Sequence, residues 1–410
     1  MFLNKNFLVI SILSLAGLTA CADLFTEAPA DNEIFDGPID GLTAVQLKGF
    51  ADGDEAFGQT FNVETGLGPI FNQTACISCH PDDGRGHPST NLTRFGKMRP
   101  DGSFDYMLEF GGPQLQDRSI PGYPAETLPG DATGISVRGG PIAVGLGLIE
   151  AIPDQTILTN EDPTDSNADD ISGRANFVDV PDYLEFGPDK VVRDDKKYLG
   201  RFGRKATTVT LLHQTVNAYK NDMGISTDFD PVDIFNPTIG STIGDNVVDP
   251  ELSAETVQNV VIYLKTLRPP ARRNESDPEV VQGELLFSTI GCASCHIQEM
   301  ESGPSLIEPL NFKAVKLFSD LLLHDMGPDL ADNFPEGDAT GTEWRTTPLW
   351  GLGIVQNVLG GTPFYLHDGR TSDLTEVIRL HQGEAQGSND RFFALPEPDR
   401  AALLAFLKSL

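Results

Sequence analysis

Basic residues are scarce in this chain: 29 lysines and arginines stand against 60 aspartates and glutamates, and the formal net charge is −31. Nucleic acids and anionic membrane surfaces are bound by clustered positive charge, so this composition argues against both as partners. Long apolar runs are missing as well. The run from Phe7 to Ala20 has only 14 residues, which is too short to span a bilayer.

Cysteine is also scarce, with five residues in the chain, and four of them form two copies of one pattern: Cys76-Ile-Ser-Cys79-His80 and Cys292-Ala-Ser-Cys295-His296. The pattern predicts covalent attachment of a c-type haem, because two thiols at this spacing add across the two vinyl groups of one porphyrin. The histidine that follows then becomes the proximal iron ligand. A zinc half-site and a redox dithiol are the alternatives, but zinc needs four ligands per ion and a dithiol needs no trailing histidine. The sequence therefore predicts two haem c groups.

The fifth cysteine, Cys21, closes the apolar run, which begins after Lys5. A positive start, an apolar core and a small-residue end are typical of a secretory signal peptide. The ending Leu18-Thr19-Ala20-Cys21 resembles the bacterial lipobox, in which the cysteine is lipidated. An ordinary signal peptide that contains a cysteine is the alternative. We expect a lipoprotein signal peptide at 1–20, lipidation of Cys21, a tether at 21–45 and no disulfide.

This signal agrees with the two motifs, because c-type haem is attached outside the bacterial cytoplasm. We therefore expect the protein in the periplasm or cell envelope, with the lipid as its only membrane contact. Ala22, which stands where an aspartate would retain a lipoprotein at the inner membrane, favours the outer membrane.

The two halves of the chain repeat three landmarks in the same order, which predicts a duplicated unit. An apolar pair precedes each motif, a short arginine–proline segment follows it, and an amphipathic helix ends each half. These landmarks are Ile70-Phe71 and Leu286-Phe287, Arg138 to Pro141 and Arg345 to Pro348, and Tyr263 to Leu267 and Phe406 to Leu410. A proline-rich linker, 268–278, separates the halves. We expect a mainly α fold with extensive coil, built as two tandem cytochrome c-like domains at 46–270 and 271–410.

From about Asp54 to Leu410 the chain resembles a bacterial family of di-haem oxidoreductases, whose members are described as peroxidases or thiol oxidoreductase-like proteins. The segments that carry the resemblance begin at Gly112 (Gly-Pro-Gln-Leu-Gln-Asp-Arg), Leu146 (Leu-Gly-Leu-Ile-Glu-Ala-Ile-Pro), Asp169 (Asp-Asp-Ile-Ser-Gly-Arg), Leu321 (Leu-Leu-Leu-His-Asp-Met-Gly-Pro) and Leu366 (Leu-His-Asp-Gly-Arg). More distantly, the chain is similar to di-haem cytochrome c peroxidases and to the di-haem enzyme that matures a tryptophan-derived quinone. In those relatives the N-terminal haem reacts with peroxide and the C-terminal haem passes electrons.

The resemblance implies a second axial ligand for the C-terminal haem. The peroxidases place a methionine, and the quinone-maturing enzyme a tyrosine, where this chain has His381. Because histidine is a good iron ligand, we expect His296 and His381 to hold the second iron. A surface role for His381 and ligation by Met326 are the alternatives. His324 and His367 are interpreted as loop-organising residues or haem-propionate contacts.

For the first haem, the peroxidases carry a glutamine and then Glu-Met-Gly at a helix end, and the glutamate acts as acid and base over the open haem face. This chain is similar, with Asp222 in place of the glutamate and Gln214 upstream, two residues closer. A carboxylate whose pKa is raised by burial suits proton exchange with peroxide. The alternatives are that Asp222 only caps a turn, or that Met223 or His87 ligates the first iron.

Two further segments carry expectations. The relatives place a tryptophan between the haems, but the matching stretch 200–204 has none, and Trp344 and Trp350 lie in the second unit, so no aromatic path between the haems is expected. Oxygen-bearing side chains alternate before Gly173, as in a short calcium loop, although the acid at position twelve is absent. The predicted ligands are Asp165, Asn167 and Asp169. A plain acidic turn is the alternative.

Together these features predict an exported, peroxidase-like di-haem c-type oxidoreductase. Electrons from a redox partner protein would pass from haem 2 to a reactive haem 1. The acidic surface suits a cationic electron carrier, or serves only solubility. The first alternative is a cytochrome that only transfers electrons, with both irons six-coordinate, and the second is an enzyme that oxidises a protein partner.

Overall fold

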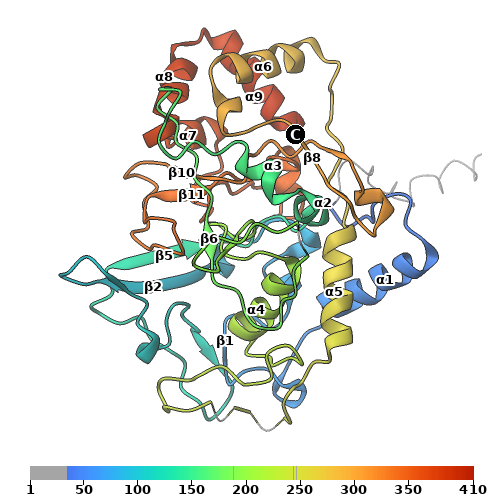
Figure 1. The fold of residues 1–410 in the computed structure, drawn as a ribbon, viewed down its shortest axis with the longest axis vertical. Coiled ribbons are helices and arrows are strands. Elements are labelled where there is room, and N and C mark those ends of the chain that lie inside the picture. Colours follow the sequence, from blue (N-terminus) through green and yellow to red (C-terminus); the bar gives the residue numbers. More distant parts are fainter. Residues whose placement is uncertain (1–34, 188, 243, 246) are drawn as a thin grey trace, which may run out of the picture.

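The computed structural model describes residues 35–187, 189–242, 244–245 and 247–410 (Figure 1). The predicted signal peptide, the lipidation site Cys21 and the first part of the tether lie outside these residues. None of the helices within the described ranges has the length and apolarity to cross a membrane. The described part of the tether differs from the expectation. Phe35 is 1% exposed in the core, and the Ile39 amide donates to the Thr266 carbonyl at 2.7 Å, so residues from 35 onward pack onto the protein.

Helices carry the main framework, as the amphipathic patterns indicate. They are α1 Ala44–Gly58, α2 Leu146–Ala151, α3 Asp154–Leu158, α4 Leu211–Met223, α5 Ala254–Thr266, α6 Pro278–Thr289, α7 Leu374–Arg379, α8 Gln386–Ala394 and α9 Glu397–Ser409. Among the longer helices, α1, α5 and α6 begin at side-chain caps: Thr43 forms a capping box with Gln46, and Ser253 and Asp277 accept from backbone amides of the first turns of α5 and α6.

Two crossed helix pairs, α1 with α5 and α6 with α9, repeat the same contacts (Figure 1). Each crossing depends on a glycine. A Cβ at Gly53 would lie 2.2 Å from the Asn259 carbonyl oxygen, and a Cβ at Gly283 would lie 2.0 Å from the Ala402 carbonyl oxygen. A phenylalanine then packs near each motif histidine, with ring centroids 6.2 Å apart in both halves: Phe57 with His80 and Phe287 with His296. These matched contacts agree with the duplication that the sequence predicts, while the cytochrome c-like character of each unit stays a prediction.

Short antiparallel strands connect the helices. They are β1 Ile70–Phe71 with β4 Arg118–Ser119, β6 Phe177–Val178 with β7 Tyr198–Leu199, β8 Met300–Glu301 with β9 Ala314–Val315, and β10 Leu323–Asp325 with β11 Glu343–Arg345. The sheet of β3 Phe104–Asp105, β2 Leu92–Met98 and β5 Gly134–Arg138 projects at the left of Figure 1.

The expectation of a mainly α fold did not include this three-stranded sheet. The sheet positions two arginine side chains. Arg94 on β2 pairs with Ser136 on β5, and Arg138 lies two residues further along β5. Because side chains alternate along a strand, Arg94 and Arg138 point from the same face of the sheet.

The boundary near residue 270 marks the duplication but does not separate the halves physically. Side chains of the first half hold the loop between β10 and β11 of the second. Lys205, which is fully buried, donates to Asp332 at 2.8 Å and to two backbone carbonyls, and Arg174 pairs with Glu343 at 2.5 Å. Arg138 contributes a further pair with Asp332 at 3.3 Å. The two predicted domains therefore interlock.

Candidate functional site

One cavity of about 660 Å³ reaches both Cys-x-x-Cys-His motifs. Its wall includes most of the side chains that the sequence singled out: Cys76, Cys79, His80, Gln214, Asp222, Met223, Cys292, Cys295, His296, Met326 and His381. These residues come from both halves of the chain. The structure therefore brings the two motifs to a shared interior space rather than to separate surfaces.

Each motif forms a short 3-10 turn, at Cys76–Ser78 (η3) and Cys292–Ser294 (η7). Burial, and after it the charge of Asp222, raises the pKa of Cys76 and Cys79 to about 12. Burial likewise raises the pKa of Cys292 to about 12.

The two motif histidines are oriented in the same way. His80 donates from Nδ1 to the Pro141 carbonyl at 2.8 Å, and His296 donates from Nδ1 to the Phe318 carbonyl at 2.9 Å. Because Nδ1 is used in this hydrogen bond, Nε2 of each ring is free to bind an iron atom. Burial lowers the pKa of His80, and it lowers that of His296 to about 4. Both imidazoles are therefore neutral near pH 7, which is the form that binds iron.

His381 lies on the cavity wall with one ring nitrogen available. It follows α7 and donates from Nδ1 to the Val377 carbonyl at 2.7 Å, which leaves Nε2 free. His296 lines the same cavity, and after burial the charge of His381 is among the causes that lower the pKa of His296. Ligation of the second iron by His381 stays a prediction. Asn389 on α8 fixes this turn, because its amide donates to three backbone carbonyls of 378–381 at 2.9 Å each.

Met326, the competing ligand, also lines the cavity, and it packs with a small apolar cluster formed by Leu330, Trp344 and Leu380. No feature of the sequence near His381 indicated that Asn389 would hold its turn. That residue could be identified only once α8 was seen to pack against the end of α7.

Asp222 lies at the end of α4, beside the first motif. Its backbone carbonyl accepts from the Asn72 and Gln73 amides, at 2.8 and 3.0 Å, which precede that motif in the chain. Its carboxylate Oδ1 accepts from Gln114 Nε2 at 2.7 Å. Burial raises the pKa of Asp222 to about 6, although the Gln114 bond and the charge of Arg94 oppose this shift. The group can therefore gain or lose a proton near neutral pH.

The glutamine that contacts Asp222 is Gln114, not Gln214. Gln214 lines the cavity but accepts from the Thr208 hydroxyl at 2.9 Å, and it lies eight residues before Asp222 on α4, about 12 Å along the helix axis. Gln114 belongs to one of the segments that carry the family resemblance, yet that segment gave no role for it. Helix spacing within α4 could not indicate a contact with a residue 108 positions away.

The two other candidates for the first iron differ from each other. Met223 is 2% exposed and lines the cavity, so it remains within the site. His87 is exposed, caps the turn at 88–90 by accepting from the Ser89 amide at 3.1 Å, and contacts the Phe364 ring. It is absent from the cavity wall, so the structure does not support ligation by His87.

Positive charge gathers on the cavity wall, although the chain as a whole is strongly acidic. The arginines there are Arg85, Arg94, Arg138, Arg204 and Arg345. Burial lowers the pKa of Arg85 and Arg345 to about 10, so both remain cations near pH 7. Arg85 Nε is buried without a hydrogen-bond partner among the described residues, whereas Arg94 Nε pairs with Glu336 at 3.1 Å. Guanidinium groups are suited to carboxylates, so these residues fit haem propionates.

The remaining histidines of the wall are already engaged. His324 lies between Asp320 and Glu384, with each ring nitrogen 2.7 Å from a carboxylate oxygen. Burial lowers its pKa, but these two hydrogen bonds reverse the shift and raise the pKa well above the ordinary value. His367 stacks on Trp344 with ring centroids 3.8 Å apart.

Trp344 and Trp350 both line the shared cavity, although both belong to the second half of the sequence. Trp350 packs against the first half, where a Cβ at Gly145 would lie 2.5 Å from its ring. Position in the sequence therefore did not exclude aromatic rings from the space between the two motifs.

The predicted calcium loop is closed by its own amides. Asp165 Oδ1 accepts from the Asp169 amide at 2.9 Å, Asn167 Oδ1 accepts from the same amide at 3.0 Å, and Asp169 Oδ1 accepts from the Ile171 amide at 3.0 Å. This arrangement is that of an acidic turn, and a cation would have to displace these bonds. The structure does not support calcium at Asp165, Asn167 and Asp169.

Comparison with known proteins places the site in a family context. A family model with the description "Di-haem oxidoreductase, putative peroxidase" matches residues 126–410, which include Asp222, the second motif and His381. No curated protein matches the chain. Among solved structures, a chain of hydrazine synthase from Kuenenia stuttgartiensis, pressurised with 20 bar xenon, is similar at a TM-score of 0.34 and 13% identity, over 99% of this chain and 100% of that one. A score this low carries no structural argument.

Proposed function

We propose, from the premise that this chain belongs to the di-haem oxidoreductase family, that it is a peroxidase-like enzyme with two unequal haem sites. Two covalently attached haem c groups would supply one-electron redox chemistry. Cys76, Cys79 and His80 would hold the first, and Cys292, Cys295, His296 and His381 the second. The observation that carries the proposal is the asymmetry of the shared cavity: a second imidazole, His381, shares the wall with His296, whereas the half-buried carboxylate of Asp222 lies beside the first motif.

The first site offers proton exchange. Asp222 would take a proton from a hydroperoxide and return it to the leaving oxygen, as a general base and then a general acid. A pKa of about 6 suits both steps near neutral pH. Gln114 holds carboxylate oxygen Oδ1 in place, which leaves the other oxygen to face the substrate.

The second site offers electron entry. His296 and His381 would together hold the second haem, which would then serve electron transfer rather than substrate binding. Electrons would therefore enter through the second site and be consumed at the first. The aromatic rings of Trp344 and Trp350 share the wall of the intervening cavity.

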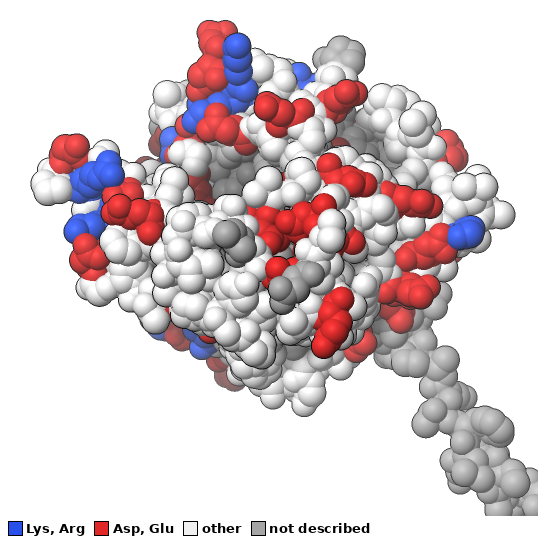
Figure 2. Space-filling view, turned by 90° about the horizontal axis from the view of Figure 1, so that it is seen from below, with Lys and Arg blue, Asp and Glu red and all other residues white. Residues whose placement is uncertain are grey.

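The electron donor is proposed to be a cationic redox protein. The net charge is −31, and the face seen from below carries many more acidic than basic side chains (Figure 2). Opposite charge of this kind steers association. We also propose export to the periplasm and anchoring by a lipid at Cys21, because covalent haem attachment takes place outside the bacterial cytoplasm.

One observation favours the alternative of a cytochrome that only transfers electrons. Met223 is buried, lines the cavity and is adjacent to Asp222 in the chain. Its thioether could close the first iron and exclude peroxide. The ligand across from His80 therefore decides between the two functions.

Optical and EPR spectra of the purified protein test this choice. The enzyme predicts one low-spin ferric haem and one high-spin ferric haem whose signal disappears on addition of cyanide. His381→Ala should convert the low-spin haem to a high-spin one, whereas Met223→Leu should leave the spectrum of the first haem unchanged. Both haems should stay on the polypeptide after denaturation. Two low-spin haems in every redox state, with Met223→Leu opening one of them, would establish the alternative.

A further inference from the structure

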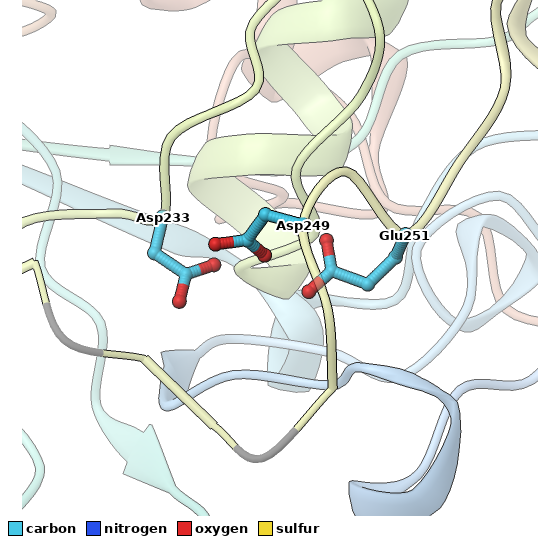
Figure 3. A group of neighbouring side chains, drawn as sticks. All are labelled: Asp233, Asp249 and Glu251. Carbon is cyan, nitrogen blue, oxygen red and sulfur yellow. The ribbon is translucent and has the colours of Figure 1, made fainter.

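Three carboxylates gather in the segment between α4 and α5, away from the haem cavity. The ligand oxygens of Asp233, Asp249 and Glu251 lie within 4.8 Å of one another (Figure 3). None of the three lines the cavity described above. The group contains no histidine or cysteine, so its ligand atoms are oxygens alone.

Asp233 points into this group with an unpaired oxygen. The residue is 4% exposed, and its Oδ1 has no hydrogen-bond partner among the described residues. Figure 3 shows its carboxylate directed toward that of Asp249, with Glu251 on the other side of Asp249. Glu251 Oε1 is likewise buried and unpaired in the described part of the chain. Two buried carboxylate oxygens without donors indicate that a ligand is needed to satisfy them.

The surrounding protein does not balance this negative charge. Asp245 adds further negative charge to the surroundings of Asp233, Asp249 and Glu251. Lys220 is the neighbouring cation, but its ammonium group is held by Asp230 at 2.8 Å from each carboxylate oxygen. The face of the molecule in Figure 2 is acidic as well.

The loops around the group are built to hold these oxygens in place. The Ser226 amide donates to Glu251 Oε2 at 2.7 Å, which fixes that carboxylate and leaves Oε1 directed elsewhere. The Gly244 backbone lies against Asp233, because a Cβ at position 244 would be 1.2 Å from Oδ2. Tyr123 donates to the Gly244 carbonyl at 2.6 Å, so this contact is also tied to the loop that carries Tyr123.

We propose that Asp233, Asp249 and Glu251 bind a calcium ion. Calcium takes six to eight oxygen ligands in flexible geometry, so three carboxylates together with water and backbone carbonyls suit it. Magnesium is bound by one or two carboxylates and demands a near-ideal octahedron, and zinc favours nitrogen and sulfur ligands. The proposal is independent of the peroxidase-like function.

A cation here would also hold the end of α4. Ser226, which contacts Glu251 and Asp249, follows Asp222 by four residues. The Leu252 amide donates to the Ser226 carbonyl at 3.2 Å, so segments 226–228 and 249–252 are already joined. Calcium would add a further link between the segment after α4 and the segment before α5.

Titration of the EDTA-dialysed, full-length holoprotein with CaCl2 by calorimetry tests the site. We expect one calcium ion per chain, with a dissociation constant of about 10⁻⁵–10⁻³ M. Asp233→Asn and Glu251→Gln should each weaken binding by at least about tenfold, because each removes a charged ligand. Hydrogen exchange of residues 226–252 should slow on addition of calcium. Magnesium should bind more weakly than calcium.

The acidic turn at 165–169 supplies the matched control. Asp165→Asn makes the same carboxylate-to-amide change in another acidic cluster and should leave calcium binding unchanged. Without calcium, Asp233→Asn should unfold at a temperature no lower than the original protein, since it removes an unpaired buried charge. Absence of calcium binding, binding that survives both Asp233→Asn and Glu251→Gln, or binding lost only in Asp165→Asn would overturn the proposal.

Discussion

At the scale of single residues, the proposed chemistry depends on the contact between Gln114 and Asp222. Burial disfavours the ionised form of Asp222, while the Gln114 hydrogen bond and the charge of Arg94 stabilise it. These opposing effects leave its pKa at about 6. A carboxylate without such partners would be held neutral by burial, and a fully exposed one would be too weak a base.

Asp222→Asn should lower peroxide turnover at least about tenfold, because the amide cannot exchange a proton. The pH profile gives a second readout. The base form is lost as the pH falls through about 6, so turnover by the original protein should fall on the acid side, and this limb should be absent in Asp222→Asn. Steady-state rates between pH 4.5 and 8 would measure both effects.

Gln114→Leu separates a positioning role from a structural one. Loss of the hydrogen bond should raise the pKa of Asp222, so the acid limb should move to higher pH while haem content stays the same. Gln214→Leu is the control. Because Gln214 bonds to Thr208, this change should leave the acid limb of the pH profile where it is.

An unchanged peroxide turnover in Asp222→Asn would contradict the proposed role of Asp222 in proton exchange.

At the scale of elements, each half is held together by a helix crossing at one glycine. The close approach at Gly53 and at Gly283 brings one backbone against the carbonyl of the partner helix, and any Cβ there would overlap it. The same crossings place Phe57 and Phe287 near the motif histidines. Helix packing and the geometry of the proposed haem sites are therefore coupled.

Gly53→Ala and Gly283→Ala should each destabilise the protein by about 1–3 kcal/mol, because the added methyl group forces the crossed helices apart. Alanine otherwise favours a helix over glycine by about 1 kcal/mol. Gly58 is the matched control, because it also lies in α1 but a Cβ there would have no atom within 4 Å. Gly58→Ala should leave stability unchanged or raise it. Denaturant unfolding measures all three, and equal behaviour of the three variants would contradict the argument.

At the scale of the whole molecule, charge is segregated. The surface is acidic, as the net charge of −31 requires, while arginines line the interior cavity. Acidic groups of the second half pair with basic groups of the first, as Asp332 does with Lys205. The acidic exterior suits the proposed cationic partner, and the arginines of the cavity suit the carboxylates of the proposed haem groups.

Electron transfer from a cationic cytochrome should slow by about tenfold or more as ionic strength rises from about 0.01 to 0.15 M, where the Debye length falls from about 30 to 8 Å. Stopped-flow kinetics of haem reduction would measure the rate. A neutral small-molecule donor is the control and should show little dependence on salt. A rate for the protein donor that is independent of salt would contradict steering by surface charge.

The sequence alone indicated the duplicated halves and their closing helices, because these features depend on local spacing. It did not indicate the sheet that carries Arg94 and Arg138, since pairing of β2 with β5 joins residues 38 to 46 positions apart. It also selected Gln214 over Gln114, because helix spacing relates only residues that are close in the chain. The tether was drawn too long because composition could not reveal that Phe35 packs into the core.

By itself, the sequence predicted the attachment chemistry of two Cys-x-x-Cys-His motifs, because spacing within five residues is enough to indicate it. Only the tertiary structure decided that both motifs open onto one cavity and that their surroundings differ. His381 and Gln114 lie 85 and 108 positions from the residues they serve, His296 and Asp222. Burial and contacts at that separation set the pKa values and the ligands, and they arise from folding rather than from any local pattern.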